Sequence, residues 1–137
     1  ILMEQGELQP AALCVWLWSD LLVNNFTGQQ QLIFDGTSRT LIEAQALESL
    51  LRFYGFTKPK VILLEVDEAV AQDRLRLRGR ADDLRPDGIT KRLTWFATSV
   101  RPVIDYYKNN SYYQVVTLNA ARPVAEIQQE IIGLLWL

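Results

Sequence analysis

Short apolar runs alternate with helical patterns along this chain, and this alternation constrains the fold more than any other feature. The runs QLIFD (31–35), KVILLEV (60–66) and YQVVTLN (113–119) have the composition and length of buried strands. Helical patterns occupy about 10–25, 40–54, 67–78, 87–108 and 123–137. Continuous apolar strands separated by helices predict an α/β fold, in which a parallel sheet carries helices on both faces.

The carboxyl ends of the predicted strands can be located in the sequence. The first run ends at Asp35-Gly36 and is followed by Arg39 at the start of a helix. The second ends just before Asp67, which can cap the next helix, and the third leads into a loop that contains Arg122. Because ligands of open parallel sheets bind beyond the carboxyl ends of the strands, we expect a polar site at this edge.

Positive charge is concentrated in a chain whose net charge is -2. Residues 1–38 contain no lysine or arginine, whereas residues 74–92 hold seven of the fourteen basic residues. Arginine favours bidentate contacts with phosphate or carboxylate oxygens, although a solvated helix face is an alternative interpretation of such a run. Proteins that bind nucleic acid usually carry a net positive charge, whereas this chain has a net charge of -2, so we expect no nucleic-acid partner.

The residue types present limit the chemistry. The chain contains no histidine, which excludes the usual base of Ser-His and Cys-His catalysis and the commonest zinc ligand. Cys14 is the only cysteine, so we expect a core residue, no disulfide framework and a cytoplasmic location. No window reaches the roughly 18 apolar residues of a membrane helix, so no membrane partner is expected. Phosphoryl transfer fits the remaining arginines and aspartates, because it depends on positioning and charge stabilisation.

Six segments of the chain are informative when they are taken together: GELQP (6–10), DGTSRT (35–40), VILLEVDEAVAQDRLRLRGRADD (61–83), ITKRL (89–93), PVIDYY (102–107) and NAARPVAEI (119–127). Their order and approximate spacing resemble those of the adenylate kinase family of nucleoside monophosphate kinases. The chain resembles this family over essentially its whole length, in the short-lid form, because RGRADD carries no long insertion. The resemblance implies a kinase that binds ATP, a nucleoside monophosphate and Mg²⁺, and we expect a monomer.

The resemblance also organises the chain as one partial domain, residues 1–137. Residues 1–45 would belong to the monophosphate-binding region, about 78–88 would form the short lid, and the remainder would be core. The family's N-terminal strand and phosphate loop, which ends in GK[ST], have no counterpart in these residues. We therefore expect an inactive C-terminal fragment, or less readily a natural loss. The alternative is a noncatalytic nucleotide-binding or interaction domain that has lost the phosphate loop.

Two segments carry the implied monophosphate site. In GELQP, the resemblance places Leu8 and Gln9 along the pocket for the base, although the family typically has valine at the second of these positions. In DGTSRT, Gly36 forms the turn and Arg39 clamps the phosphate of the monophosphate. Asp35 would hold a water molecule on the magnesium ion.

The family pattern places three arginines against ATP. Arg74 would pack against the base and Arg78 would contact the phosphates; the two lie four residues apart on one helical face. The loop around Arg122 would meet the ATP base mainly through its backbone.

The resemblance assigns the transfer step to two further arginines. Arg80 in GRADD and Arg92 in KRL would reach the phosphoryl group in flight, while Asp82 and Asp83 would organise the arginines of the lid. Plain helix or loop charges are the alternative interpretation of these residues.

Two positions depart from the family pattern. DGFPR is replaced by DGTSR, so Ser38 stands where the family has a cis-proline and the turn must be held in another way. Glu43 occupies the position of a base-reading glutamine. A carboxylate offers acceptors only, which suits the N1 and N2 donors of guanine better than the edge of adenine. We therefore expect poor discrimination in favour of AMP; the alternative is that Glu43 points to solvent and reads nothing.

Overall fold

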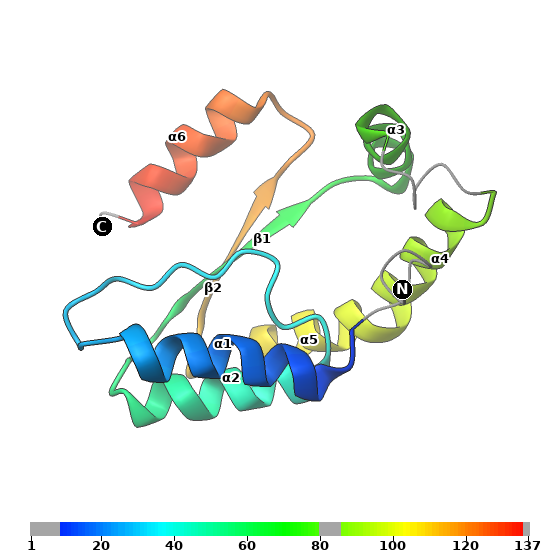
Figure 1. The fold of residues 1–137 in the computed structure, drawn as a ribbon. Coiled ribbons are helices and arrows are strands. Elements are labelled where there is room, and N and C mark those ends of the chain that lie inside the picture. Colours follow the sequence, from blue (N-terminus) through cyan, green and yellow to red (C-terminus); the bar gives the residue numbers. More distant parts are fainter. Residues whose placement is uncertain (1–8, 80–85, 136–137) are drawn as a thin grey trace.

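The computed structural model describes residues 9–79 and 86–135 (Figure 1). Its elements follow the order α1 (Ala11–Asn25), α2 (Leu41–Phe53), β1 (Lys60–Glu65), α3 (Glu68–Arg78), α4 (Gly88–Trp95), η2 (Phe96–Val100), α5 (Arg101–Asn109), β2 (Gln114–Asn119) and α6 (Val124–Leu135). The two strands pair in parallel, with Lys60 opposite Gln114 and Glu65 opposite Asn119. Two of the three predicted strands and their orientation are therefore confirmed.

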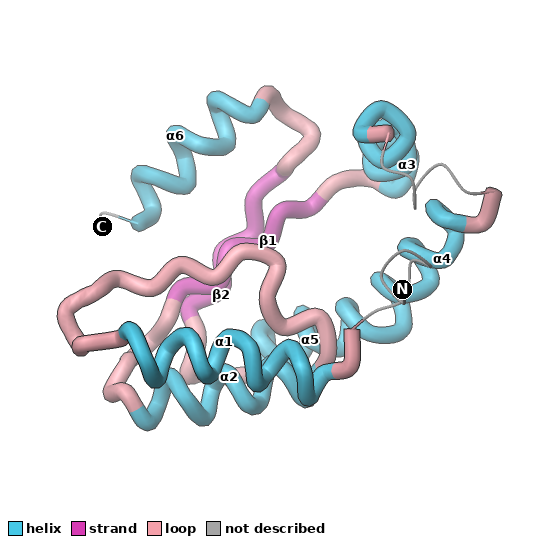
Figure 2. The backbone as a smooth tube through the Cα atoms, viewed as in Figure 1, coloured by secondary structure: helices cyan, strands magenta, loops and turns pink. Residues whose placement is uncertain are grey.

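Helices cover both faces of this sheet, as Figure 2 shows. Buried residues of α2 and α5 pack against Val61 and Val115 on one face. Buried and half-buried residues of α6 pack against Ile62 and Val116 on the other. Successive side chains of a strand point to opposite faces, so each strand must be apolar on both. The predicted parallel sheet with helices on both faces is confirmed.

The strand predicted at 31–35 is wrong. Residues 31–34 belong to no helix or strand, residues 35–36 form a bend, and Ile33 is 80% exposed. An extended segment becomes a strand only where a neighbouring strand supplies hydrogen-bond partners for its backbone. Within the described part of the chain, β1 and β2 pair with each other and neither pairs with this segment.

The long helix predicted at 87–108 is interrupted. The π-helical turn η2 separates α4 from α5, and the N–H of Arg101 donates to the carbonyl of Phe96, five residues earlier. Pro102 lies in the first turn of α5, where its missing N–H would break the hydrogen-bond ladder of a continuous α-helix. The wider turn before the proline accommodates this break without ending the helical segment.

Helices α1 and α2 lie side by side and run in the same direction (Figures 1 and 2). Their carboxyl ends meet through Phe26, whose ring centroid lies 5.0 Å from that of Tyr54 and 5.5 Å from that of Phe56. The outer surface of α1 is apolar, with Trp16 60% and Leu21 62% exposed. Among the described residues, no helix combines the length and the apolar character needed to cross a membrane.

Candidate functional site

The chain topology brings most of the predicted site segments to one edge of the sheet. Residues 54–59 connect α2 directly to β1, so α2 runs back along the sheet and its first turn lies toward the carboxyl ends of the strands. Residues 110–113 connect α5 to β2 in the same way, which places α4 toward the same edge. Figure 1 shows the start of α2 together with α3 and α4 on the side to which the strands point.

The turn before α2 has a strained backbone. Gly36 has φ 63°, and Ser38 has φ 65°, which costs a non-glycine residue about 1 kcal/mol. The described residues contain no cis peptide bond, so Ser38 does not reproduce the geometry of the family's cis-proline. Ser38 is only 5% exposed, so this residue of the turn is packed against the protein.

Helix α2 begins with a variant of the capping box, formed by Thr40 and Glu43. The Thr40 hydroxyl accepts a hydrogen bond from the backbone N–H of Glu43 at 3.4 Å and donates to Glu43 Oε1 at 3.0 Å. Glu43 Oε2 accepts from the backbone N–H of Arg39 at 2.8 Å. Glu43 is 4% exposed, so the alternative that it points to solvent is wrong. Sequence reasoning missed the role of Thr40, although the T-x-x-E spacing is the signature of a capping box.

Arg39 lies exposed at this turn. Its Nε donates to the carbonyl of Gly36 at 3.2 Å, which folds the side chain back over the turn. Among the described residues, its guanidinium makes no ion pair with a carboxylate. An arginine with an uncompensated charge beside a helix N-terminus is a favourable binding group for a phosphate.

The start of α1 lies close to the same turn. The Cys14 thiol is half-buried and donates to Gln9 Oε1 at 3.6 Å. Burial raises the pKa of this thiol, the negative charge of Glu43 raises it further, and the positive charge of Arg39 opposes both. Gln9, which the resemblance places along the base pocket, therefore lies at the end of α1 that is near this turn. Leu8 lies outside the described residues.

Asp35 is exposed at the start of the turn. Within the described ranges its carboxylate has no protein partner, and no cluster of three or more acidic, cysteine or histidine side chains could enclose a metal ion. Mg²⁺ commonly keeps most of its water and is held by one or two carboxylates together with substrate phosphates. A single accessible carboxylate in the turn that carries Arg39 fits this mode of Mg²⁺ binding.

Helix α3 presents the arginines predicted to contact ATP. Arg74 and Arg78 are both exposed, and the helix has no buried residue. Asp67 occupies the N-cap position as predicted, but its side chain makes no capping hydrogen bond. Arg76 lies exposed on the same helix and pairs with Asp73 at 3.0 Å.

The remaining predicted residues lie in α4, in the loop after β2 and outside the described ranges. Arg92 is half-buried in α4. Arg122 donates through Nε to the carbonyl of Asn119 at 3.1 Å and pairs with Glu130 of α6, so its side chain is held by the protein. The backbone of the loop is held as well, because the N–H of Ala121 donates to Asn119 Oδ1 at 2.8 Å. The predicted contact of this loop with the ATP base stays a prediction. The remaining predicted site residues lie outside the ranges that the structure describes; they are Leu8, Arg80, Asp82 and Asp83.

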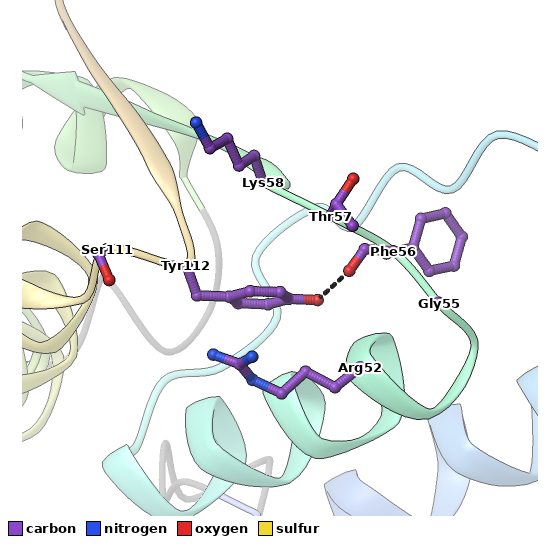
Figure 3. Close-up of a pocket in the computed structure, with 7 residues that line it drawn as sticks. All are labelled: Arg52, Gly55, Phe56, Thr57, Lys58, Ser111 and Tyr112. Carbon is purple, nitrogen blue, oxygen red and sulfur yellow. Dashed lines mark hydrogen bonds between the residues drawn. The ribbon is translucent and has the colours of Figure 1, made fainter.

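A second polar feature lies at the opposite edge of the sheet. An open pocket of about 440 Å³ is lined by Arg52, Gly55, Phe56, Thr57, Lys58, Ser111 and Tyr112 (Figure 3). The guanidinium carbon of Arg52 lies 3.9 Å from the ring centroid of Tyr112, whose hydroxyl donates to the carbonyl of Phe56 at 2.8 Å. These residues precede β1 and β2 in the chain, so the pocket is separate from the arginines at the carboxyl edge.

Comparisons with known proteins point to one family. A family profile described as adenylate kinase matches residues 1–112. The chain is 34% identical over 139 aligned positions to an adenylate kinase of Synechococcus sp. (strain JA-2-3B'a(2-13)), covering 98% of this chain and 70% of the relative. It is 38% identical to an adenylate kinase of Synechococcus sp. (strain CC9902), covering 94% of this chain and 68% of the relative. An adenylate kinase of Phocaeicola vulgatus is 35% identical, over 82% of this chain and 60% of the relative. The chain thus spans between 60% and 70% of the length of these relatives.

Proposed function

This chain belongs to the adenylate kinase family, and from that premise we propose that it forms most of a nucleoside monophosphate kinase. The reaction would transfer the γ-phosphoryl group of ATP to AMP or a related monophosphate. The observation that carries this proposal is the exposed Arg39 guanidinium, which lies at the start of α2 without an ion-pair partner among the described residues. A phosphate group of the substrate would supply the missing negative charge.

The proposed mechanism depends on positioning and charge rather than on acid–base chemistry. Arg39 would bind the phosphate of the monophosphate and orient its oxygen toward ATP. Arg74 and Arg78 would bind ATP from α3, and Arg92 and Arg80 would stabilise the negative charge of the group in transfer. When bound, Mg²⁺ would neutralise phosphate charge, and Asp35 would hold it through water.

We propose that the chain divides into the regions that the resemblance implies. The first turns of α1 and α2 lie together, which is consistent with a monophosphate-binding region in residues 1–45. In that region Leu8, Gln9 and Gly36 would complete the pocket around Arg39. Residues 78–88 would form the lid, in which Asp82 and Asp83 orient the arginines. We further propose a cytoplasmic monomer.

We propose that residues 1–137 alone do not transfer a phosphoryl group. They contain no GxxGxGK[ST] motif, whose backbone N–H groups and lysine cradle the β- and γ-phosphates of ATP. The same observation favours a second candidate function, a noncatalytic nucleotide-binding domain. The coding sequence upstream of Ile1 separates the two: an in-frame motif supports the kinase, and its absence supports the binding domain. Measurable production of ADP by the purified chain from ATP, AMP and Mg²⁺ would contradict the proposed inactivity.

Calorimetric titration of the 137-residue chain tests the binding that both functions share. We expect AMP to bind at least about tenfold more tightly than adenosine, because only AMP offers a phosphate for a charge-assisted hydrogen bond with Arg39. The nucleoside is the matched control, since it carries the same base and ribose. Equal affinities for the two ligands would remove the phosphate site from the proposal.

A further inference from the structure

The carboxylate of Glu43 reaches back across the start of α2 to the residue before the helix cap. In the usual capping box, the carboxylate accepts a hydrogen bond from the backbone N–H of the N-cap residue. Here the N-cap residue is Thr40, but Glu43 Oε2 accepts from the backbone N–H of Arg39 at 2.8 Å. The other oxygen, Oε1, accepts from the Thr40 hydroxyl at 3.0 Å. The group that Glu43 restrains is therefore the backbone of Arg39.

Arg39 requires such a restraint because the residue before it is left-handed. Ser38 has φ 65°, a conformation that persists in a non-glycine residue only when the surroundings impose it. The Arg39 side chain is also fixed, since its Nε donates to the carbonyl of Gly36 at 3.2 Å. Glu43 holds the backbone of this residue and the turn holds its side chain, so together they set the direction of the guanidinium.

The same contacts leave Glu43 poorly placed to read a nucleotide base. Its side chain belongs to a residue that is 4% exposed, and each carboxylate oxygen already accepts a hydrogen bond. The charge of Glu43 also acts on the Cys14 thiol of α1, which places the carboxylate near α1. The carboxylate is thus held between the start of its own helix and the turn before it.

We propose that Glu43 is a positioning residue, whose carboxylate fixes the Arg39 backbone and thereby the place where the guanidinium meets the phosphate of any nucleoside monophosphate. This inference rests on the proposed function. According to this inference, the glutamate that stands at position 43 in place of the family's glutamine affects how the phosphate is positioned and does not select the base. Base recognition is then left to other groups of the pocket.

A ligand without a base separates positioning from base reading. We would titrate ribose 5-phosphate, AMP and GMP into the chain and into the variants Glu43→Ala, Glu43→Gln and Gln45→Ala. If Glu43 positions Arg39, Glu43→Ala weakens binding of all three ligands by the same factor, about tenfold. Glu43→Gln restores binding to within about threefold, because the amide oxygen can accept from Arg39 and the amide nitrogen can donate to Thr40. Gln45 is exposed on the same helix and serves as the control, which should bind like the parent.

Two further measurements test the route through Arg39. In an Arg39→Ala background, Glu43→Ala should cause no additional loss of binding, because the residue it positions is gone. Amide hydrogen exchange at Arg39 should accelerate in Glu43→Ala and stay near the parent rate in Glu43→Gln, which reports on the turn even where Glu43→Ala is poorly folded.

The possible results have distinct meanings. A parent chain that binds none of the three phosphorylated ligands overturns the proposed function and this inference with it. Binding by the parent that survives in Glu43→Ala overturns the inference alone. A changed ratio of AMP to GMP affinity in Glu43→Gln, with ribose 5-phosphate unaffected, shows that Glu43 reads the base and also rejects positioning. Equal losses in Glu43→Ala, with rescue by glutamine, confirm the inference.

Discussion

The hydroxyl of Tyr106 on α5 donates a hydrogen bond to the carboxylate of Glu48 on α2. The same carboxylate accepts from Asn110 at 2.6 Å and from Arg52 at 2.8 Å. Burial of the carboxylate would raise its pKa, but the hydrogen bonds from Tyr106, Arg52 and Asn110 hold the pKa of Glu48 below its ordinary value. Because α2 and α5 cover the same face of the sheet, this cluster ties together the two helices of that layer.

We predict that Tyr106→Phe destabilises the protein by about 1 kcal/mol, the usual net value of one hydrogen bond, which here has a charged acceptor. The ring remains, so the loss reports on the hydroxyl. Tyr54→Phe is the matched control, because no hydrogen bond joins the Tyr54 hydroxyl to the described residues. Urea unfolding monitored by circular dichroism measures both variants; equal effects of the two substitutions would contradict the assigned bond.

The same cluster predicts how stability depends on pH. Burial and the neighbouring Glu48 carboxylate raise the pKa of Tyr106 from 10.0 to about 12. The contribution of Tyr106 to the free energy of unfolding is therefore complete below pH 10 and is lost as the pH rises through about 12. The lowered pKa of Glu48 matters in acid. The contribution of Glu48 to the free energy of unfolding is present above pH 4.5 and is lost as the pH falls below that value. Urea midpoints across these two windows test the prediction. If the loss of stability at alkaline pH persists unchanged in Tyr106→Phe, groups other than Tyr106 cause it.

Arg39→Ala should reduce phosphoryl transfer by at least about a hundredfold in the protein encoded by the complete reading frame, because a charge-assisted phosphate contact is lost in the transition state. The free energy of unfolding should change little, since Arg39 is exposed. Arg76→Ala is the control, as Arg76 is a surface arginine paired with Asp73. A coupled assay of ADP formation gives kcat and KM; values equal to those of the parent would exclude Arg39 from the site.

Lys58→Gly should raise the free energy of unfolding by about 0.5 kcal/mol. Lys58 has φ 48°, a left-handed conformation that costs glycine nothing but strains a residue with a Cβ atom. Part of the gain is offset by the greater freedom of glycine in the unfolded chain. Lys58→Ala removes the same charge but keeps the strain, so chemical denaturation of both variants separates the two effects. A gain of equal size in Lys58→Ala would show that charge is responsible.

The fold was predictable where a strand has its partner within the chain. The runs at 60–66 and 113–119 pair with each other, so their apolar patterns led to the observed β1 and β2. The run at 31–35 has a similar pattern, yet Ile33 is exposed and the segment is not a strand. Apolar patterning measures the tendency to be buried, whereas strand formation also depends on a neighbour that the pattern does not identify.

The predicted phosphate-binding role of Arg39 stays a prediction, whereas the contacts that hold Arg39 could not be read from the sequence. The DG turn before Arg39 indicated a phosphate-binding position, and the structure leaves this arginine exposed. The hydrogen bond from the Arg39 backbone to Glu43 depends on the path of the chain into α2. The sequence alone allowed Glu43 either to contact the nucleotide base or to point into solvent. The polar cluster of Glu48 was not predicted at all, because its partner Tyr106 lies 58 residues away in the sequence.

The π-helical turn η2 sets the rotation of α4 relative to α5. An α-helix advances by about 100° per residue, and a π-helical turn contains about one residue more than an α-helical turn. The face of α5 that carries Val103 and Tyr107 into the core therefore does not continue in register along α4. Deleting one residue of Phe96–Val100 would turn α4 by roughly 100° about its axis, and Arg92 with it. The length of this segment, more than the identity of its side chains, decides where that arginine points.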